Sequence, residues 1–375
     1  MAKQPTAARQ NRISAVTIEG FRGLKKIEKL ALPQLTVLIG ANGSGKSTLI
    51  RFFEMLNWML RAQNLQEFIV RQGGGDDQFF MGARNTAKIH AEINLETAAG
   101  YNDYRFDLVH LNAGDGVMVM NEAYRYSNKQ FSTKAQWTEL PDARREATLP
   151  TLEEPTAKTI CSLLKGCATY QFHDTSINAP FRKRWDVEDF SRLRSDGGNL
   201  AAVLFGLREY SLAYYQMIVR QIKRVLPNFD DFVLEPAYGT IELRWRGTQS
   251  DKTFGAHLTS DGSLRLFCLI TLLNMPLARL PDIMFFDEPE LGLHPHAISL
   301  VAAMLKRVAE VKQVFIATQS PYMVDCFDLQ NIILAKTSNG ETTLQSLDTA
   351  EYRQWLDDDF MPSNVWLKDP IQGAA

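Results

Sequence analysis

The sequence predicts an α/β fold with a mixed sheet and a helical insertion, and three features support this prediction. A buried strand at 35–40 leads through a glycine-rich loop into a helix that begins near Lys46. A second apolar strand, at 282–288, ends in two adjacent acids. Antiparallel strand patterns and a helical pattern fill much of the chain between them, which indicates strands of both orientations and an inserted helical part.

The composition places the chain among globular proteins. With 375 residues, of which 45% are hydrophobic and 22% are charged, the chain can bury the core of one large domain or two ordinary ones. The formal net charge of -2 means that nucleic-acid binding would require a local basic patch. Four cysteines without C-x-x-C spacing argue against a zinc site and fit a reduced, cytosolic chain.

Neither a targeting segment nor a membrane span is predicted. The first residues are polar and contain no apolar core of a signal peptide. The most apolar stretch, 264–280, is interrupted by Arg265, Asn274 and Arg279, which favours a buried helix over a membrane span. We therefore expect a cytoplasmic protein without a membrane partner.

The glycine-rich loop matches the P-loop pattern G-x-x-x-x-G-K-[ST] between a strand and a helix. Its glycines let backbone N–H groups turn inward around a phosphate, and the helix N-terminus adds partial positive charge. Lys46 is expected to reach the β- and γ-phosphates, and the Ser47 hydroxyl to bind Mg²⁺. The alternative is a chance glycine-rich turn. The predicted nucleotide-binding residues are Gly40, Ala41, Asn42, Gly43, Ser44, Gly45, Lys46, Ser47 and Thr48.

The stretch "FFDEPELGLHPH" carries an apolar strand directly into acids at Asp287, Glu288 and Glu290. Burial of adjacent carboxylates costs several kcal/mol each unless a cation compensates them. In a P-loop ATPase such an acid holds Mg²⁺, so Asp287 is the predicted metal-side carboxylate. Glu288 is placed to polarise the attacking water, with a solvated strand-end acid as the alternative. Glu290 is interpreted as a turn or capping residue.

The long segment between the two motifs is harder to interpret. Residues 87–111 predict an antiparallel hairpin, and the polar run 113–157 is expected to decorate the surface. Asn199 is the predicted cap of one helix that continues to Pro227, with Tyr214 on its apolar face. Basic residues gather at 182–194, where a solvated face is favoured over a phosphate-contacting patch.

Several of these motifs resemble a known family. The segments "GFRGL", "GANGSGKST", "FFDEPELGLHP" and "VFIATQSP" resemble the ATPase heads of the RecF, SMC and overcoming-lysogenisation-defect (OLD) class of ABC ATPases. More narrowly, "YQFHDTS", "GGNLAAVL", "LTSDGSLR" and "NVWLKDPIQG" resemble stand-alone bacterial ATPases of that class. The resemblance implies a P-loop NTPase fold of ABC/SMC-head type that uses ATP and Mg²⁺.

The resemblance also implies an arrangement of parts. It predicts an N-terminal ATPase lobe with the P-loop and antiparallel strands at 1–157 and a helical insertion at 158–230. The C-terminal lobe, 231–375, would carry the signature, the Asp-Glu motif and the switch motif.

In such heads a second subunit completes the hydrolysis site. The segment at 258–263 matches the signature, so Ser260 and Gly262 are expected to contact ATP held by the other chain of a homodimer or a higher even-numbered oligomer. Asp261 stands where glycine is common and could repel a triphosphate. Because 261–263 also open an apolar helix, an ordinary helix cap at Ser260 is the alternative.

Other positions depart from the family pattern. His294 replaces the D-loop aspartate, and Gln319 replaces the switch histidine as a predicted catalytic residue. Glutamine can hydrogen-bond the γ-phosphate or the water but cannot become cationic, so slow hydrolysis is expected. Gln171, His173 and Asp174 are candidates for the Q-loop, and local turn chemistry explains them about equally well.

Two functions remain open at this stage. One is an ATP-driven dimeric switch that acts on nucleic acid or controls an effector, as relatives in DNA repair, genome maintenance and phage defence do. The stretch after Ser320 is too short for the nuclease domain of OLD enzymes, so a nuclease or toxin would be a separate partner. The alternative is an ATP-loaded scaffold that binds a partner protein and hydrolyses slowly. A transporter ATPase subunit fits the "GFRGL" and "LGLHP" segments less well.

Overall fold

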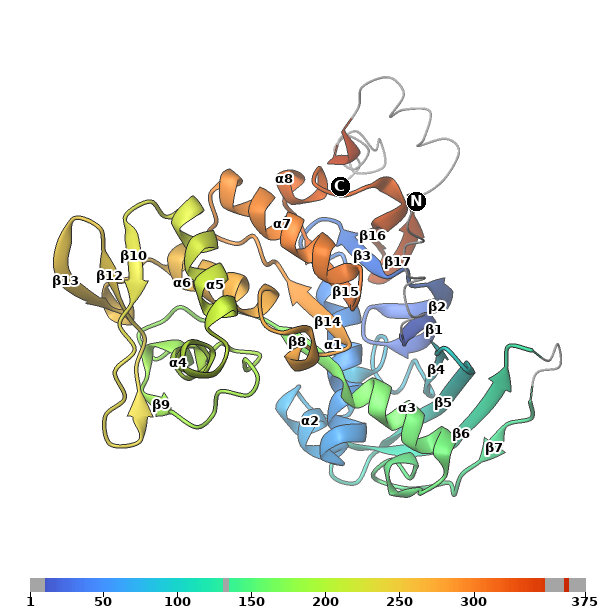
Figure 1. Cartoon of the computed structure of the whole chain (residues 1–375). Coiled ribbons are helices and arrows are strands. Elements are labelled where there is room, and N and C mark those ends of the chain that lie inside the picture. The colour runs from blue at the N-terminus through green and yellow to red at the C-terminus, as the bar shows by residue number, and fades with distance from the viewer. Residues whose placement is uncertain (1–10, 131–134, 348–360, 364–375) are drawn as a thin grey trace.

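The computed structural model describes residues 11–130, 135–347 and 361–363. Within them the chain forms two six-stranded sheets and a separate group of helices and short strands (Figure 1). In the view of Figure 1 one sheet lies at one side, the other sheet in the middle and the separate group of helices and short strands at the other side. The closing segment "NVWLKDPIQG" lies outside the described residues.

The first sheet, which we call the antiparallel sheet, is antiparallel throughout. Side chains alternate between its two faces, as the burial of every second residue in β4 shows. The strands in order across this sheet are β2 (Leu24–Ala31), β1 (Arg12–Phe21), β4 (Ile89–Glu96), β5 (Gly100–Leu111), β6 (Gly116–Asn128) and β7 (Thr138–Glu139).

The second sheet, which we call the core sheet, is parallel except for its edge strand β17. β3 and β15 are fully buried runs of apolar residues with only a few polar ones, as expected for parallel strands covered on both faces. The order across the sheet is β17 (Glu341–Ser346), β16 (Ile332–Ser338), β3 (Leu35–Ile39), β15 (Gln313–Thr318), β14 (Ile283–Asp287) and β8 (Cys167–Tyr170). The mixed sheet that the sequence predicts is therefore confirmed.

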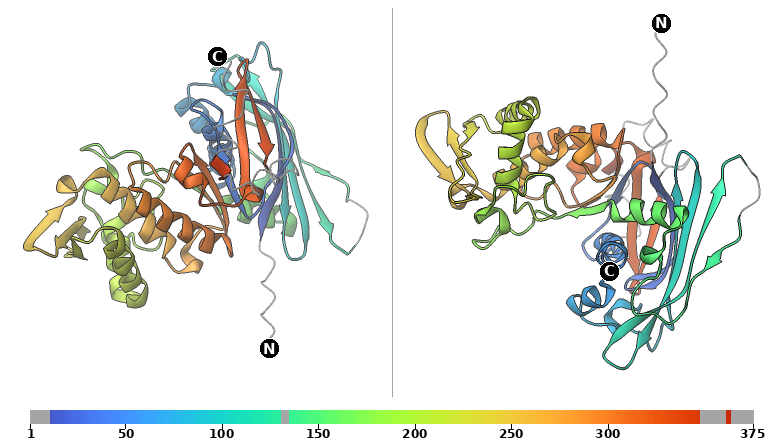
Figure 2. Two further views of the ribbon diagram at one scale, coloured as in Figure 1. Left: turned by 90° about the horizontal axis from the view of Figure 1, so that it is seen from above. Right: turned by 60° about the horizontal axis from the view of Figure 1, so that its bottom comes forward.

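Helices cover both faces of the core sheet (Figure 2). Ile283 and Phe285 of β14 point into one hydrophobic cluster, which α1 (Lys46–Asn57) and α3 (Pro155–Lys165) share with the antiparallel sheet. Met284 and Phe286 point into the other cluster, with α6 (Asp261–Leu273) and α7 (Pro295–Ala309). α1 thus lies between the two sheets, so the helix that follows the glycine loop is held from both sides. The short helices are α2 (Leu65–Arg71) and α8 (Pro321–Val324).

The helix predicted after Asn199 is two helices, α4 (Leu200–Tyr210) and α5 (Leu212–Val225). Ser211 leaves helical geometry, with φ −153° and ψ 51°, and restarts the chain in a new direction. The break changes which residues face inward, so Tyr215 is buried and Tyr214 is exposed, contrary to the prediction. The separate group also contains β9 (Trp185–Asp186), β10 (Phe229–Phe232), β11 (Thr240–Ile241), β12 (Arg244–Gly247) and β13 (Ser250–Gly255), of which the last three follow the range predicted for the insertion.

The predicted hairpin is confirmed as β4 and β5, but the surface assignment of 113–157 is wrong. This run contains β6, which pairs with β5 along nearly its full length. Val117 and Val119 are buried on one face of β6, and Met118 and Met120 on the other face are partly buried. The polar residues Asn121 and Glu122 interrupt this apolar stretch. The three-part lobe division stays a prediction, although α3 and β8 from the predicted insertion pack with the core.

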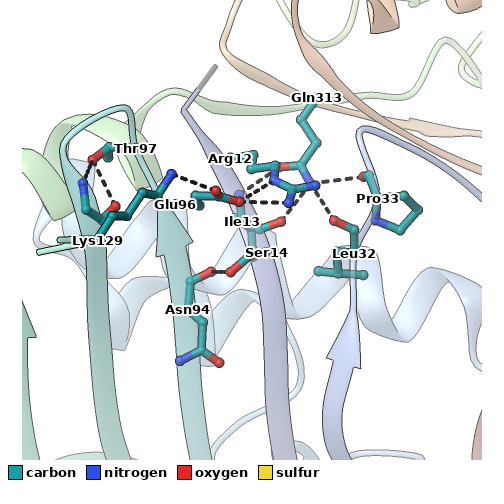
Figure 3. Close-up of polar contacts among 11 residues, drawn as sticks. Arg12, Ile13, Ser14, Leu32, Pro33, Asn94, Glu96, Thr97, Lys129 and Gln313 are labelled. Atoms are coloured by element: carbon teal, nitrogen blue, oxygen red, sulfur yellow. Dashed lines mark hydrogen bonds and ion pairs between the residues drawn. The ribbon is translucent and has the colours of Figure 1, made fainter. Parts of the chain in front are cut away.

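A buried glutamine joins the two sheets (Figure 3). The Gln313 side chain at the start of β15 accepts from the Ile13 backbone N–H at 2.8 Å and donates to the Ile13 carbonyl at 2.8 Å. It also lies 3.2 Å from the carbonyl oxygen of Pro33. The amide imitates a strand neighbour for β1, so the position of the antiparallel sheet on the core sheet is fixed by hydrogen bonds as well as by apolar packing.

Among the described residues, no helix combines the length and apolar character that spanning a bilayer requires.

Candidate nucleotide-binding site

The glycine loop and Asp287 meet at one edge of the core sheet. β3 and β14 are parallel with β15 between them, so the segments that leave their carboxyl ends lie at the same edge. The Ser47 Oγ atom lies 3.2 Å from Asp287 Oδ2 and 3.4 Å from Oδ1. Residues 240 positions apart in the chain are thus brought into hydrogen-bonding contact.

The loop backbone depends on glycine at two points. Gly43 and Gly45 have φ of 77° and 93°, in the left-handed region that side chains with Cβ atoms seldom adopt. A Cβ on Gly45 would also lie 2.2 Å from the Thr342 hydroxyl of β17, whereas a Cβ on Gly43 would meet no atom within 4 Å. The loop is therefore packed against β17 on one side and open at Gly43, where a ligand can approach.

Lys46 is folded back over this loop. Its buried ammonium donates to the carbonyls of Gly40 at 2.7 Å and Ala41 at 2.9 Å. Burial lowers the pKa of Lys46, and the nearby carboxylates of Glu288 and Asp287 oppose this shift. A phosphate at the loop would supply the full negative charge that neutral carbonyls lack.

Two of the three Q-loop candidates contact Asp287. The Gln171 amide donates to Asp287 Oδ2 at 3.3 Å, and a ring nitrogen of His173 lies 2.8 Å from the Asp287 backbone oxygen. Asp174 instead accepts from the backbone N–H of Ser176 at 3.0 Å. The structure therefore places Gln171 and His173 in the site and leaves Asp174 in its own turn.

The residue after Asp287 turns sharply away from the strand. Glu288 has φ of 43°, which is uncommon for a residue other than glycine, and its N–H donates to the Ala317 carbonyl at 2.8 Å. Gln319 follows the end of β15, the strand between the loop strand and the Asp287 strand. Both predicted catalytic residues thus lie at the edge where the loop and Asp287 meet.

Glu290 is more than the turn residue that the sequence suggested. Its carbonyl does accept a turn hydrogen bond from Leu293 N–H at 2.9 Å, but its side chain is 7% exposed and accepts from the Thr318 hydroxyl. Burial raises the pKa of Glu290. Its Oε2 atom has no hydrogen-bond partner among the described residues.

The donor set fits a hard metal ion and a phosphate chain. The Ser47 hydroxyl and the Asp287 carboxylate are oxygen ligands, which Mg²⁺ prefers when substrate phosphates supply others. No cluster of three or more His, Cys, Asp or Glu side chains that could hold a metal occurs in the described part of the chain. Phosphate oxygens of a bound nucleotide would supply further ligands to an ion at Ser47 and Asp287.

Ser260 is the N-cap of α6. Its Oγ atom accepts from the Ser263 N–H at 3.3 Å, as the alternative to a signature role predicted. A Cβ on Gly262 would lie 2.4 Å from the Gly292 carbonyl oxygen, so packing within one chain already requires glycine there. Capping and packing account for both residues and leave a second role for Ser260 and Gly262 as a prediction.

The charge of Asp261 is paired. Arg182 lies 3.0 Å from the Asp261 carboxylate and also donates to the backbone carbonyls of Thr175 and Ala256. Asp261 keeps 55% of its side chain exposed, while Arg182 is mostly buried. The repulsion of a triphosphate that the sequence suggested is thus reduced. Arg194 similarly pairs with Asp189 at 3.5 Å and keeps 52% of its side chain exposed.

Sequence reasoning missed the role of Arg265. From α6 its guanidinium donates to the carbonyls of Phe172 at 3.0 Å, His173 at 3.1 Å and Leu291 at 3.1 Å. These carbonyls belong to the segments that follow β8 and β14. The signal in the sequence is an arginine inside an apolar helix, and by itself it argues only against a membrane span.

A strand, glycine loop and helix with a carboxylate at the end of a nearby parallel strand define a P-loop nucleotide-binding protein. The Smc head bound to the C-winged helix domain of ScpA is similar, with a TM-score of 0.59 and 17% identity over 91% of this chain and 99% of that chain. The Smc head domain with an extended coiled coil from Pyrococcus furiosus, bound to the C-terminal domain of ScpA, has a TM-score of 0.57 and 15% identity over 93% and 100%. The fold is therefore that of an SMC head.

The family follows from the sequence. Residues 35–325 match the family described as "AAA domain, putative AbiEii toxin, Type IV TA system", and the chain belongs to this family. The comparison of this chain with curated proteins found no match. The predicted fold and the resemblance to the SMC-like ATPase class are confirmed.

Proposed function

We propose that this protein binds ATP with Mg²⁺ and hydrolyses it. The contact between Ser47 and Asp287 is the observation that carries the proposal, since it unites the two metal-side ligands of a P-loop ATPase. Lys46 would neutralise the β- and γ-phosphates, and Glu288 would polarise the attacking water. Gln319 would hydrogen-bond the γ-phosphate or that water.

ATP would be bound between two copies of this chain, with Ser260 and Gly262 of each copy on the nucleotide of the other. Ser260 is exposed, and exposed apolar side chains lie in the segments around it, namely Ile177, Leu258 and Leu291. Arg182 and Arg265 tie these segments together through backbone carbonyls. A joined, partly apolar surface of this kind suits a two-fold contact.

The dimer would act as an ATP-dependent switch that controls a separate effector protein or acts on nucleic acid, in phage defence or DNA maintenance. The family description names a putative toxin of a toxin–antitoxin system, and the two Smc heads were solved with ScpA bound. These descriptions support a partner protein over a small-molecule substrate.

A second function is an ATP-loaded scaffold that hydrolyses slowly. One observation favours it: Gln319 stands at the end of β15 where the family resemblance places a histidine. Glutamine has no cationic form with which to stabilise the charge that develops during phosphoryl transfer.

Turnover and assembly measured together distinguish the two functions. Glu288→Gln should keep ATP binding, lower kcat about 10²- to 10³-fold, and form an ATP-dependent dimer by light scattering. Glu153→Gln, at a side chain with 88% exposure, is the matched control and should behave like wild type. Wild-type turnover as low as that of Glu288→Gln, with both dimeric, would favour the scaffold. If wild type and Glu288→Gln hydrolyse ATP equally fast, the role of Glu288 is refuted. If Glu288→Gln stays monomeric with ATP, ATP-dependent dimerisation is refuted.

A further inference from the structure

A cavity of about 640 Å³ lies beside the core sheet, outside the P-loop site. It follows the edge strand β8 and is bounded by α1, α2 and the loop at 189–195. Its lining includes neither the loop residues 40–48 nor Asp287. Its size is in the range of pockets that bind small ligands of nucleotide size.

The charged residues that line the cavity are mainly cations. Arg51 pairs with Glu54 at 2.6 Å and Arg194 pairs with Asp189 at 3.5 Å, and these two acids are the carboxylates of the lining. The six cationic side chains of the lining are Arg51, Arg61, Arg71, Lys165, Arg192 and Arg194. Cations thus outnumber carboxylates three to one.

Half of these cations lack an acidic partner. Arg61, Lys165 and Arg192 form no ion pair with any residue in the described ranges. They come from the π-helical turn Trp58–Ala62 after α1, the end of α3 and the loop before α4, so the fold brings them together from distant parts of the chain. Like charges converging on a concave surface repel each other and focus a positive potential, which an anion relieves.

The cavity also offers an aromatic wall. Trp58 lines it, and the Arg71 guanidinium lies 5.1 Å from the Trp58 ring centroid while pairing with Glu67 on its own helix. A planar ring beside guanidinium groups suits a ligand that combines phosphates with a flat or apolar part.

We propose that this cavity binds a phosphorylated ligand that is distinct from the ATP at the P-loop. The ligand is a free phosphate compound, such as a nucleotide, or the phosphates of a nucleic-acid strand. This inference goes beyond the proposed function, because the site needs neither a second chain nor a nucleotide at Lys46.

The site is connected to the proposed ATPase chemistry at two points. Tyr170 lines the cavity at the end of β8, and the next residue, Gln171, donates to the Asp287 carboxylate at 3.3 Å. Arg51 and Glu54 line it from α1, the helix that begins at Lys46. An anion that shifts β8 or α1 would therefore move groups that hold the proposed metal ligand.

The test uses the full chain with Lys46→Ala, so that the P-loop lysine does not contribute. Binding of inorganic tripolyphosphate and of a fluorescent single-stranded oligothymidylate is measured separately at low salt. Arg61→Glu and Arg192→Glu are compared with Arg220→Glu, an exposed residue of α5 outside the cavity that changes the net charge equally. Thermal unfolding confirms that all variants fold.

Each cavity variant should lower the affinity for the bound probe about tenfold or more. For the oligothymidylate, the affinity should also depend less steeply on salt. Arg220→Glu should change the affinity less than about twofold. Tripolyphosphate binding alone supports a free phosphate compound, whereas oligothymidylate binding supports a nucleic-acid strand. Failure of both probes to bind overturns the proposal. So does an equal loss in Arg220→Glu, which would indicate general charge attraction.

Discussion

The two halves of the proposed ATP site differ in how far a single chain builds them. On the P-loop side, Lys46 and Asp287 are buried, and Ser47 already contacts the Asp287 carboxylate. On the signature side, Ser260 is exposed, and its side-chain hydrogen bonds to Ser263 are those of a helix cap. The difference indicates that one half is preorganised within the chain, whereas the other would acquire a ligand only from a partner in the proposed dimer.

The largest expected effect is a loss of ATP affinity on the P-loop side of the site. Lys46→Ala should lower ATP affinity roughly a hundredfold or more, because truncating one partner of a buried charge pair costs about 2–5 kcal/mol. Titration with a fluorescent ATP analogue measures this loss. Lys26→Ala, at a lysine with 57% side-chain exposure, is the control and should bind normally. Normal ATP affinity in Lys46→Ala would show that the loop is not the nucleotide site.

The next effect tests the signature half. Ser260→Asp keeps a capping oxygen for α6 but adds a negative charge, so ATP should bind while ATP-dependent dimerisation weakens at least about tenfold. Ser260→Asn keeps the cap without the charge and serves as the control. Gly262→Arg would be less clear, since any Cβ at Gly262 collides with the Gly292 carbonyl.

The same variants test whether the two halves act between chains. A mixture of Lys46→Ala chains with Ser260→Asp chains should regain part of the ATPase activity, because one composite site then has intact motifs on both sides. A mixture that stays inactive, although both variants remain folded, contradicts the two-chain site.

The smallest effect concerns the charge beside the signature. Arg182→Gln leaves Asp261 unpaired and should weaken the ATP-dependent dimer about two- to fivefold, since a partly exposed ion pair contributes at most about 1 kcal/mol. The double variant Arg182→Gln/Asp261→Asn should restore dimerisation in sedimentation experiments. If it does not, the bonds from Arg182 to Thr175 and Ala256 matter more than the charge.

Prediction succeeded where the pattern is local. The strand, glycine loop and helix form a continuous segment, and "FFDE" is a buried strand with its own acids, so both could be found from short windows. It failed where the local sequence pattern is interrupted or carries no turn signal. The apolar stretch of β6 is interrupted by Asn121 and Glu122, and the turn at Ser211 has no glycine or proline to mark it.

By itself the sequence determined the class of site, because the residue types at Lys46, Ser47 and Asp287 admit little chemistry other than phosphate and metal binding. Tertiary structure alone decided which distant residues meet them. Gln171 reaches Asp287, Arg182 neutralises Asp261, and the cations beside β8 converge on one cavity because sheet pairing and helix packing join segments far apart in the chain. Such contacts depend on long-range packing, which no local pattern encodes.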